Sequence, residues 1–105
     1  MLDFFKNIMG GGSNADFSDL IDNKGAIIID VRSKGEYQGG HLKNSINISL
    51  RDLESNLSKL KKDKPIITCC ASGARSASAK SILISNGFSE VYNGGAWQNL
   101  QKHER

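Results

Sequence analysis

The chain has 105 residues, of which 38% are hydrophobic and 24% are charged, and this composition is typical of one small globular domain. Its net charge of +3 is too small a basic surplus to indicate a nucleic-acid-binding protein. No stretch approaches the ~20 apolar residues of a membrane span. Asp3 and Lys6 interrupt the apolar N-terminus, where a secretory signal needs an unbroken run. We therefore expect a cytoplasmic protein with no membrane span and no nucleic-acid partner.

The first 15 residues differ in character from the rest of the chain. Residues 10–15 read Gly-Gly-Gly-Ser-Asn-Ala, which is typical of a flexible joint. Residues 1–9 carry several apolar side chains that either pack on the domain or contact a partner or membrane surface, and the pattern leaves both possibilities open. The sequence thus divides into an N-terminal segment with a glycine-rich joint (1–15) and one domain (16–105).

The domain begins with a predicted helix, a strand and a second helix. Residues 16–23 favour a short helix capped by Asp16. Residues 26–31 form a continuous, mostly β-branched run, which is typical of a strand buried on both faces. Ser33 and Glu36 have the spacing of a capping box, so another short helix is expected to begin at Ser33.

The remaining elements continue the same alternation. Residues 45–48 predict a strand, and a helix capped by Ser49 should follow, because leucines recur at three- and four-residue steps. The later elements expected are a strand over 65–69, a loop from Cys70, a helix over 76–86, a strand over 90–93, a turn at Gly94-Gly95 and a helix over 96–102. This order predicts an α/β fold with a mainly parallel central sheet flanked by helices.

The two cysteines, Cys69 and Cys70, are adjacent, so they cannot join distant parts of the fold. A reducing compartment is the natural interpretation. Successive side chains on a strand point to opposite faces, and we interpret Cys69 as a core residue. The alternative role for Cys69 is to resolve an oxidised Cys70.

Cys70 stands where a predicted strand enters a loop of small residues and then a helix. Backbone N–H groups of such a loop can converge on the sulfur, with the helix N-terminus behind them. This environment lowers a thiol pKa from about 8.5 and increases the reactive thiolate. Gly73 can supply a backbone conformation that other residues resist, and Arg75 adds a positive charge. The alternative is that Cys70 is a small buried hydrophobe, as most free cysteines are.

Three separated pieces of the sequence resemble a rhodanese domain over roughly residues 16–103. Their order and spacing together are specific, although no single piece is decisive. The pieces are Ile29-Asp30-Val31-Arg32 with Glu36-Tyr37, Gly40-His41-Leu42 and Ile46-Asn47-Ile48; the loop Cys70-Ala71-Ser72-Gly73-Ala74-Arg75-Ser76; and Asn93-Gly94-Gly95 with Trp97.

The resemblance implies a sulfurtransferase that carries a persulfide on Cys70, with Arg75 as the second catalytic residue. It implies that backbone N–H groups of the loop hold the sulfur, the loop being Ala71, Ser72, Gly73, Ala74, Arg75 and Ser76. The residues that match framework positions are Asp30, Arg32, Glu36 and His41, and we expect them to be mainly structural, with a general base as the alternative for His41.

The resemblance further implies a small sulfur-containing anion or a persulfide as donor, a thiol or protein as sulfur acceptor, and no metal or cofactor. The sequence departs from the family pattern in two places. Asn44-Ser45 replaces the usual Gly-Ala, and Cys69 replaces an aromatic or aliphatic residue. Arg75 is the only charged residue of the loop, so the choice between thiosulfate and a thiol persulfide stays open.

Two other functions fit parts of the same pattern. Counted from Cys69, the chain has a cysteine, five residues, Arg75 and Ser76, which is also the loop pattern of a cysteine-dependent phosphatase. The second alternative is a non-turnover module that carries sulfur to one partner or only binds it.

Overall fold

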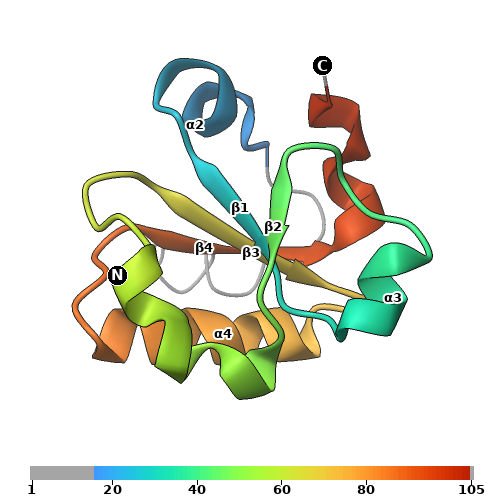
Figure 1. The fold of residues 1–105 in the computed structure, drawn as a ribbon. Coiled ribbons are helices and arrows are strands. Elements are labelled where there is room, and N and C mark those ends of the chain that lie inside the picture. Colours follow the sequence, from blue (N-terminus) through green and yellow to red (C-terminus); the bar gives the residue numbers. More distant parts are fainter. Residues whose placement is uncertain (1–15, 105) are drawn as a thin grey trace.

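The computed structural model describes residues 16–104, so the predictions for residues 1–15 lie outside the described residues. The elements follow the alternating order expected from the sequence (Figure 1). They are α2 (Ser18–Asn23), β1 (Ile27–Asp30), α3 (Lys34–Gln38), β2 (Ser45–Asn47), the 3₁₀ helices η1 (Leu50–Asp52) and η2 (Glu54–Lys59), β3 (Ile66–Cys70), α4 (Ala74–Ser85), β4 (Val91–Ala96) and the 3₁₀ helix η3 (Trp97–His103).

The four strands form one parallel sheet in the order β2-β1-β3-β4, and this confirms the predicted fold class. Figure 1 shows α4, η1 and η2 on one face of the sheet and α2 and η3 on the other. A separate apolar cluster fills each side, and every residue of β3 is buried between them. Continuous apolar strands are what a sheet covered on both faces requires. Among residues 16–104, no helix is long and apolar enough to cross a membrane.

The capping box at the start of α3 is confirmed. The backbone N–H of Glu36 donates to Ser33 Oγ at 3.3 Å, and the Ser33 N–H donates back to Glu36 Oε1 at 3.1 Å. At α2 the predicted cap is displaced, because Phe17 is the N-cap residue and Asp16 accepts from the Ser18 N–H at 2.9 Å one residue earlier.

The helix predicted after Ser49 is present as the two 3₁₀ helices η1 and η2, with Ser49 at the N-cap position but without a capping hydrogen bond from its side chain. The carbonyl of Asp52 accepts from the Ser55 hydroxyl at 3.0 Å and from Asn56 Nδ2 at 2.8 Å. The Asn56 N–H bonds instead to Leu53 O at 3.0 Å. Polar side chains therefore occupy the carbonyl that an α-helix would offer to the backbone. The leucines still face inward, and Leu53 and Leu60 are buried.

Three boundaries near the end of the chain also differ from the prediction. Helix α4 begins at Ala74 rather than at residue 76, and the helix expected over 96–102 is the 3₁₀ helix η3 over 97–103. Strand β4 continues through Gly94 and Gly95 instead of ending before them. A Cβ on Gly94 would lie 2.8 Å from the carbonyl oxygen of Thr68, so this glycine permits close pairing of β4 with β3.

Candidate active site

The two cysteines lie on opposite faces of β3, as the strand period predicts. Cys69 packs in the apolar cluster beneath α2 and η3 with Leu42 and Leu100. Cys70 is the last residue of β3 and packs on the α4 side with Ala79. Neither cysteine has exposed surface. The pKa of each thiol therefore depends on the groups that surround its sulfur.

Backbone N–H groups gather around the Cys70 sulfur. The Gly73 N–H donates to Sγ at 2.9 Å, and the Ser76 N–H in the first turn of α4 donates at 3.4 Å. Gly73 has φ +104°, a left-handed conformation that glycine adopts without penalty and other residues resist. The loop can therefore turn back over the sulfur and aim its amides at it.

These donors give the two thiols opposite pKa shifts. Burial by itself raises the pKa of Cys70, but hydrogen bonds from the Ser76 hydroxyl and from the amides of Ser76, Gly73 and Ser72 offset burial, and the net pKa lies below its ordinary value. Burial raises the pKa of Cys69 far above its ordinary value, and the nearby Asp30 adds to this rise. Cys70 is therefore the better thiolate of the pair.

Asn93 holds the loop in place, a role that sequence reasoning missed. Its Oδ1 accepts from the Ser76 hydroxyl at 2.6 Å and from the Gly95 N–H at 2.9 Å, and its Nδ2 donates to Gly73 O at 3.3 Å. Ser76 Oγ lies 3.4 Å from the Cys70 sulfur and accepts from it while the thiol is protonated. When Cys70 is ionised, the Ser76 hydroxyl can turn its proton to the thiolate, which lowers the pKa of Cys70. The only signal for this role was an amide residue directly before two glycines near the end of a predicted strand.

Arg75 lies at the loop but its guanidinium is paired with Glu36. Nη1 donates to Oε1 at 2.7 Å and Nη2 to Oε2 at 2.9 Å, so the two groups meet side by side. The hydrogen bonds from Arg75, followed by those from Ser33, lower the pKa of Glu36 to about 2. The pair ties the start of α4 to α3.

Asp30 and Arg32 form a buried ion pair at the end of β1. Arg32 Nη2 lies 2.8 Å from Asp30 Oδ2, and Nε lies 2.9 Å from Oδ1. The same guanidinium donates to the carbonyls of Glu36 and Gly40 and lies over the Trp97 ring, 4.9 Å from its centroid. This geometry fits the framework role that the sequence suggests, because the pair fastens α3 and the turn that follows it to the end of β1.

His41 is exposed and lies beyond the end of α3. Its Nδ1 is 2.8 Å from the carbonyl oxygen of Tyr37, and its ring stacks on the Tyr37 ring at a centroid distance of 3.9 Å. These contacts fix the imidazole against its own helix rather than against the Cys70 loop.

Comparison with known proteins agrees with this geometry. The model of the rhodanese-like domain family matches residues 13–102. The chain is 35% identical over 98 residues to the thiosulfate sulfurtransferase GlpE of Pseudoalteromonas translucida, covering 90% of each chain. It is 38% identical over 68 residues to YqhL of Bacillus subtilis, and the match spans 65% of this chain and 54% of YqhL.

A solved structure gives the same result. A rhodanese with anions from E. coli superposes with a TM-score of 0.66 at 30% identity, over 70% of this chain and 89% of the other. The chain therefore belongs to the rhodanese-like domain family.

Proposed function

We propose that this protein is a rhodanese-type sulfurtransferase in which Cys70 carries sulfur from a donor such as thiosulfate or a persulfide to a thiophilic acceptor. The observation that carries the proposal is the 2.9 Å hydrogen bond from the Gly73 N–H to the Cys70 sulfur. A sulfur anion needs donors of this kind, whereas a cysteine that only fills the core does not.

In the first half-reaction the Cys70 thiolate attacks the sulfane sulfur of the donor. A new S–S bond forms, the S–S bond of thiosulfate breaks, and sulfite leaves with the bonding electron pair. The product is a Cys70 persulfide anion. The amides of Gly73 and Ser76 donate to the Cys70 sulfur. In this proposal the same ring of donors stabilises the negative charge of the persulfide.

In the second half-reaction an acceptor thiolate attacks the outer sulfur of the persulfide. The Cys70 S–S bond breaks, its electrons return to Cys70 as a thiolate, and the acceptor leaves as a new persulfide. The two steps balance without an external oxidant or reductant. Because Cys70 has no exposed surface, the loop that follows it must open before donor or acceptor can reach the sulfur.

Arg75 has a supporting role in this proposal. Its side chain donates two hydrogen bonds to Glu36, and these position the loop against α3. The guanidinium is also close enough to Cys70 to interact with its charge. We therefore place Arg75 as a positioning residue that holds the amide ring and adds a favourable field.

The phosphatase alternative has less support. It requires Cys69 as nucleophile, and the Cys69 thiol lies among apolar side chains on the other face of the sheet. Its raised pKa also disfavours the thiolate at neutral pH. Hydrolysis of p-nitrophenyl phosphate that depends on Cys69 and not on Cys70 would restore this alternative.

Intact-mass spectrometry after incubation with thiosulfate tests the proposal. The unmodified chain and the Cys69→Ser variant should each gain the mass of one sulfur atom, and Cys70→Ser should gain none. Steady-state release of sulfite in the presence of a thiol then separates a turnover enzyme from a carrier that loads once. A sulfur adduct that persists in Cys70→Ser would contradict the proposal.

A further inference from the structure

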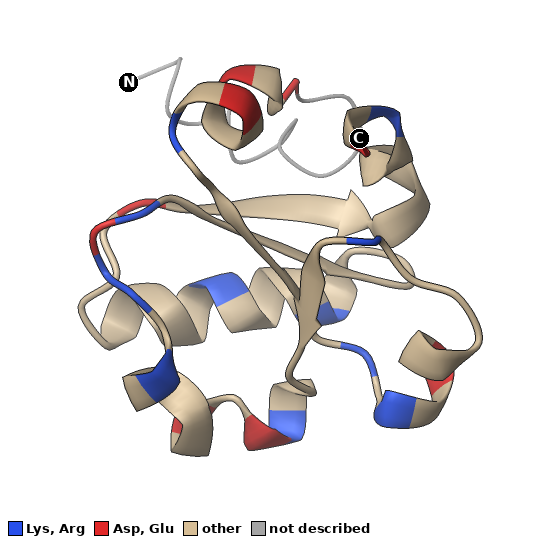
Figure 2. Cartoon of the chain, turned by 45° about the horizontal axis from the view of Figure 1, so that its top comes forward, with Lys and Arg blue, Asp and Glu red and all other residues tan. Residues whose placement is uncertain are grey.

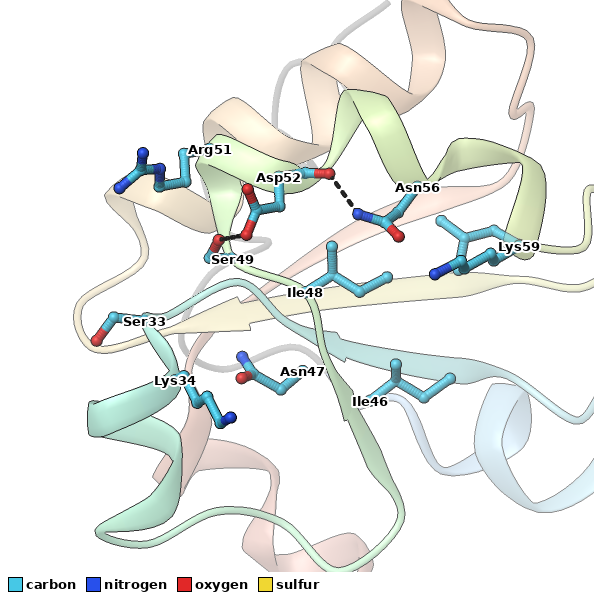
Figure 3. Close-up of a pocket in the computed structure, with 11 residues that line it drawn as sticks. Ser33, Lys34, Ile46, Asn47, Ile48, Ser49, Arg51, Asp52, Asn56 and Lys59 are labelled. Atoms are coloured by element: carbon cyan, nitrogen blue, oxygen red, sulfur yellow. Dashed lines mark hydrogen bonds between the residues drawn. The ribbon is translucent and has the colours of Figure 1, made fainter.

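An open groove of about 670 Å³ lies beside β2, and the described residues that line it do not include the Cys70 loop. Its walls come from β2, the beginning of α3, and the two 3₁₀ helices η1 and η2 (Figure 3). A pocket of this volume holds an organic molecule or a short peptide. It is far larger than a small sulfur anion needs, so the proposed sulfur transfer leaves it unexplained.

The groove carries a local excess of positive charge. Lys34, Arg51 and Lys59 line it from three different elements, and Asp52 is the only carboxylate among the described residues that line it. Asp52 accepts a hydrogen bond from Ser49 Oγ at 3.0 Å. Across residues 16–104 the three cations form no ion pair, unlike Arg32 and Arg75. Figure 2 shows basic segments on α3 and on the 3₁₀ helices, with the uncharged strand β2 between them.

An apolar strip lies between these charges. β2 is an edge strand whose neighbour is β1, and Ile46 on β2 is 44% exposed, one of two large exposed apolar side chains in the described chain. Ile48 and Leu60 also line the groove. Ile46 is exposed, whereas Ile48 is half-buried and Leu60 is buried, so one apolar side chain stands free between the charges. An apolar contact within a charged rim is typical of a protein-binding site. The matching occupant is an extended segment with an apolar residue among several carboxylates.

Two sets of contacts connect the groove with the Cys70 loop. Ser33 lines the groove and donates to Glu36 Oε1 through both its N–H and its hydroxyl, and the same carboxylate binds Arg75. In addition, η1 packs against α4, the helix whose N-cap residue is Gly73. A partner held in the groove would therefore contact Ser33 and η1, and both are connected through these contacts with the segment that holds the Cys70 loop.

We propose that the groove docks an acidic, extended segment of a protein that exchanges sulfur with Cys70. This inference rests on the sulfur transfer proposed above and names the chemistry of the protein partner. Docking through charges that surround an apolar contact chiefly raises the association rate and selects the partner, while Cys70 and its amides perform the transfer.

Binding of a synthetic peptide tests the groove without any sulfur chemistry. The probe is a fluorescein-labelled, cysteine-free peptide in which glutamates alternate with leucine, compared with the same peptide carrying glutamine. The groove variant is Lys34→Ala/Arg51→Ala/Lys59→Ala. The matched control, Lys43→Ala/Lys61→Ala/Lys102→Ala, removes the same charge from exposed lysines elsewhere.

Fluorescence anisotropy at low salt should show binding of the glutamate peptide to the unmodified protein. The groove variant should raise the Kd about tenfold and the control variant less than about twofold. The glutamine peptide should bind the unmodified protein weakly. Its Kd should be at least as high as the Kd of the glutamate peptide for the groove variant. Failure of the glutamate peptide to bind the unmodified protein, or equal weakening by both triple variants, would overturn the proposal.

A second measurement uses the same peptide with one cysteine as acceptor for a loaded Cys70 persulfide. The groove variant should transfer sulfur more slowly to this peptide and at an unchanged rate to 2-mercaptoethanol. Loss of transfer to both acceptors would show that the variant harms the site and would count against the groove. If the unmodified chain does not load sulfur, the proposed function fails. The anisotropy result still decides whether the groove binds acidic segments.

Discussion

Arg75 and Glu36, which are 39 residues apart in the sequence, meet through two parallel hydrogen bonds of 2.7 and 2.9 Å. One partner belongs to the Cys70 loop and the other to the capping box of α3. The Glu36 carboxylate therefore completes the N-terminal cap of α3 and also binds the loop that surrounds the reactive sulfur. Two hydrogen bonds in one plane restrict the loop more than a single contact between point charges would.

The first prediction concerns the pH dependence of this pair. The pKa of Glu36 is lowered to about 2, so its contribution to stability is present above the unfolded value of 4.5 and is lost as pH falls toward 2. Thermal unfolding gives the difference in Tm between the unmodified protein and Glu36→Gln. This difference should be constant above pH 4.5 and should shrink as the pH falls below 4.5. Glutamine keeps the cap acceptor, so the difference reports the pair with Arg75. A difference that is independent of pH would contradict this assignment.

The second prediction concerns the origin of the lowered Cys70 pKa. Ser76→Ala removes a hydroxyl that stabilises the thiolate, and Asn93→Ala frees the loop that carries the amides, so both should raise the pKa of Cys70. The ultraviolet absorbance of the thiolate against pH measures this, with the Cys70→Ser titration subtracted. The control is Ser78→Ala, an exposed position in the same helix, which should leave the pKa unchanged. An unchanged titration in both test variants would mean that other groups set the pKa.

The sequence predicted those features that depend on neighbouring residues. The capping box at Ser33 needs a spacing of three residues, and the opposite faces of Cys69 and Cys70 need only the period of a strand. Features that depend on distant segments were not predictable in this way. Asn93 binds the loop because β4 pairs with β3, and no local pattern shows which groups that pairing brings together.

The type of helix after Ser49 and the length of β4, which the sequence did not predict, have equally physical causes. Leucine spacing after Ser49 identifies an inward-facing stripe, and a 3₁₀ helix satisfies the same stripe nearly as well as an α-helix does. The choice depended on Ser55 and Asn56, whose side chains take the carbonyl of Asp52. At Gly94 the close approach of Thr68 allows the strand to continue where the glycine pair predicted a turn.

The third prediction compares two glycine substitutions. Gly73→Ala places a side chain at φ +104°, which costs on the order of 1–3 kcal/mol and moves the amide that faces the sulfur. Persulfide loading by thiosulfate should fall by more than the loss of folded protein accounts for. Gly35→Ala is the control, because its Cβ would meet no atom within 4 Å and the helix α3 favours alanine. Normal loading by Gly73→Ala would show that the amide geometry is not required.

The fourth prediction concerns the ion pair of Asp30 and Arg32, whose side chains are 0% and 6% exposed. Asp30→Asn removes one charge and leaves the Arg32 guanidinium buried without its counter-ion, and loss of one partner of such a pair costs about 3–5 kcal/mol. Urea unfolding should show this decrease in the free energy of unfolding. Asp19→Asn alters an exposed pair with Lys24 at 3.9 Å and should cost less than about 1 kcal/mol. Equal effects in the two variants would mean that Arg32 is held by the carbonyls of Glu36 and Gly40 and by Trp97, with Asp30 contributing little.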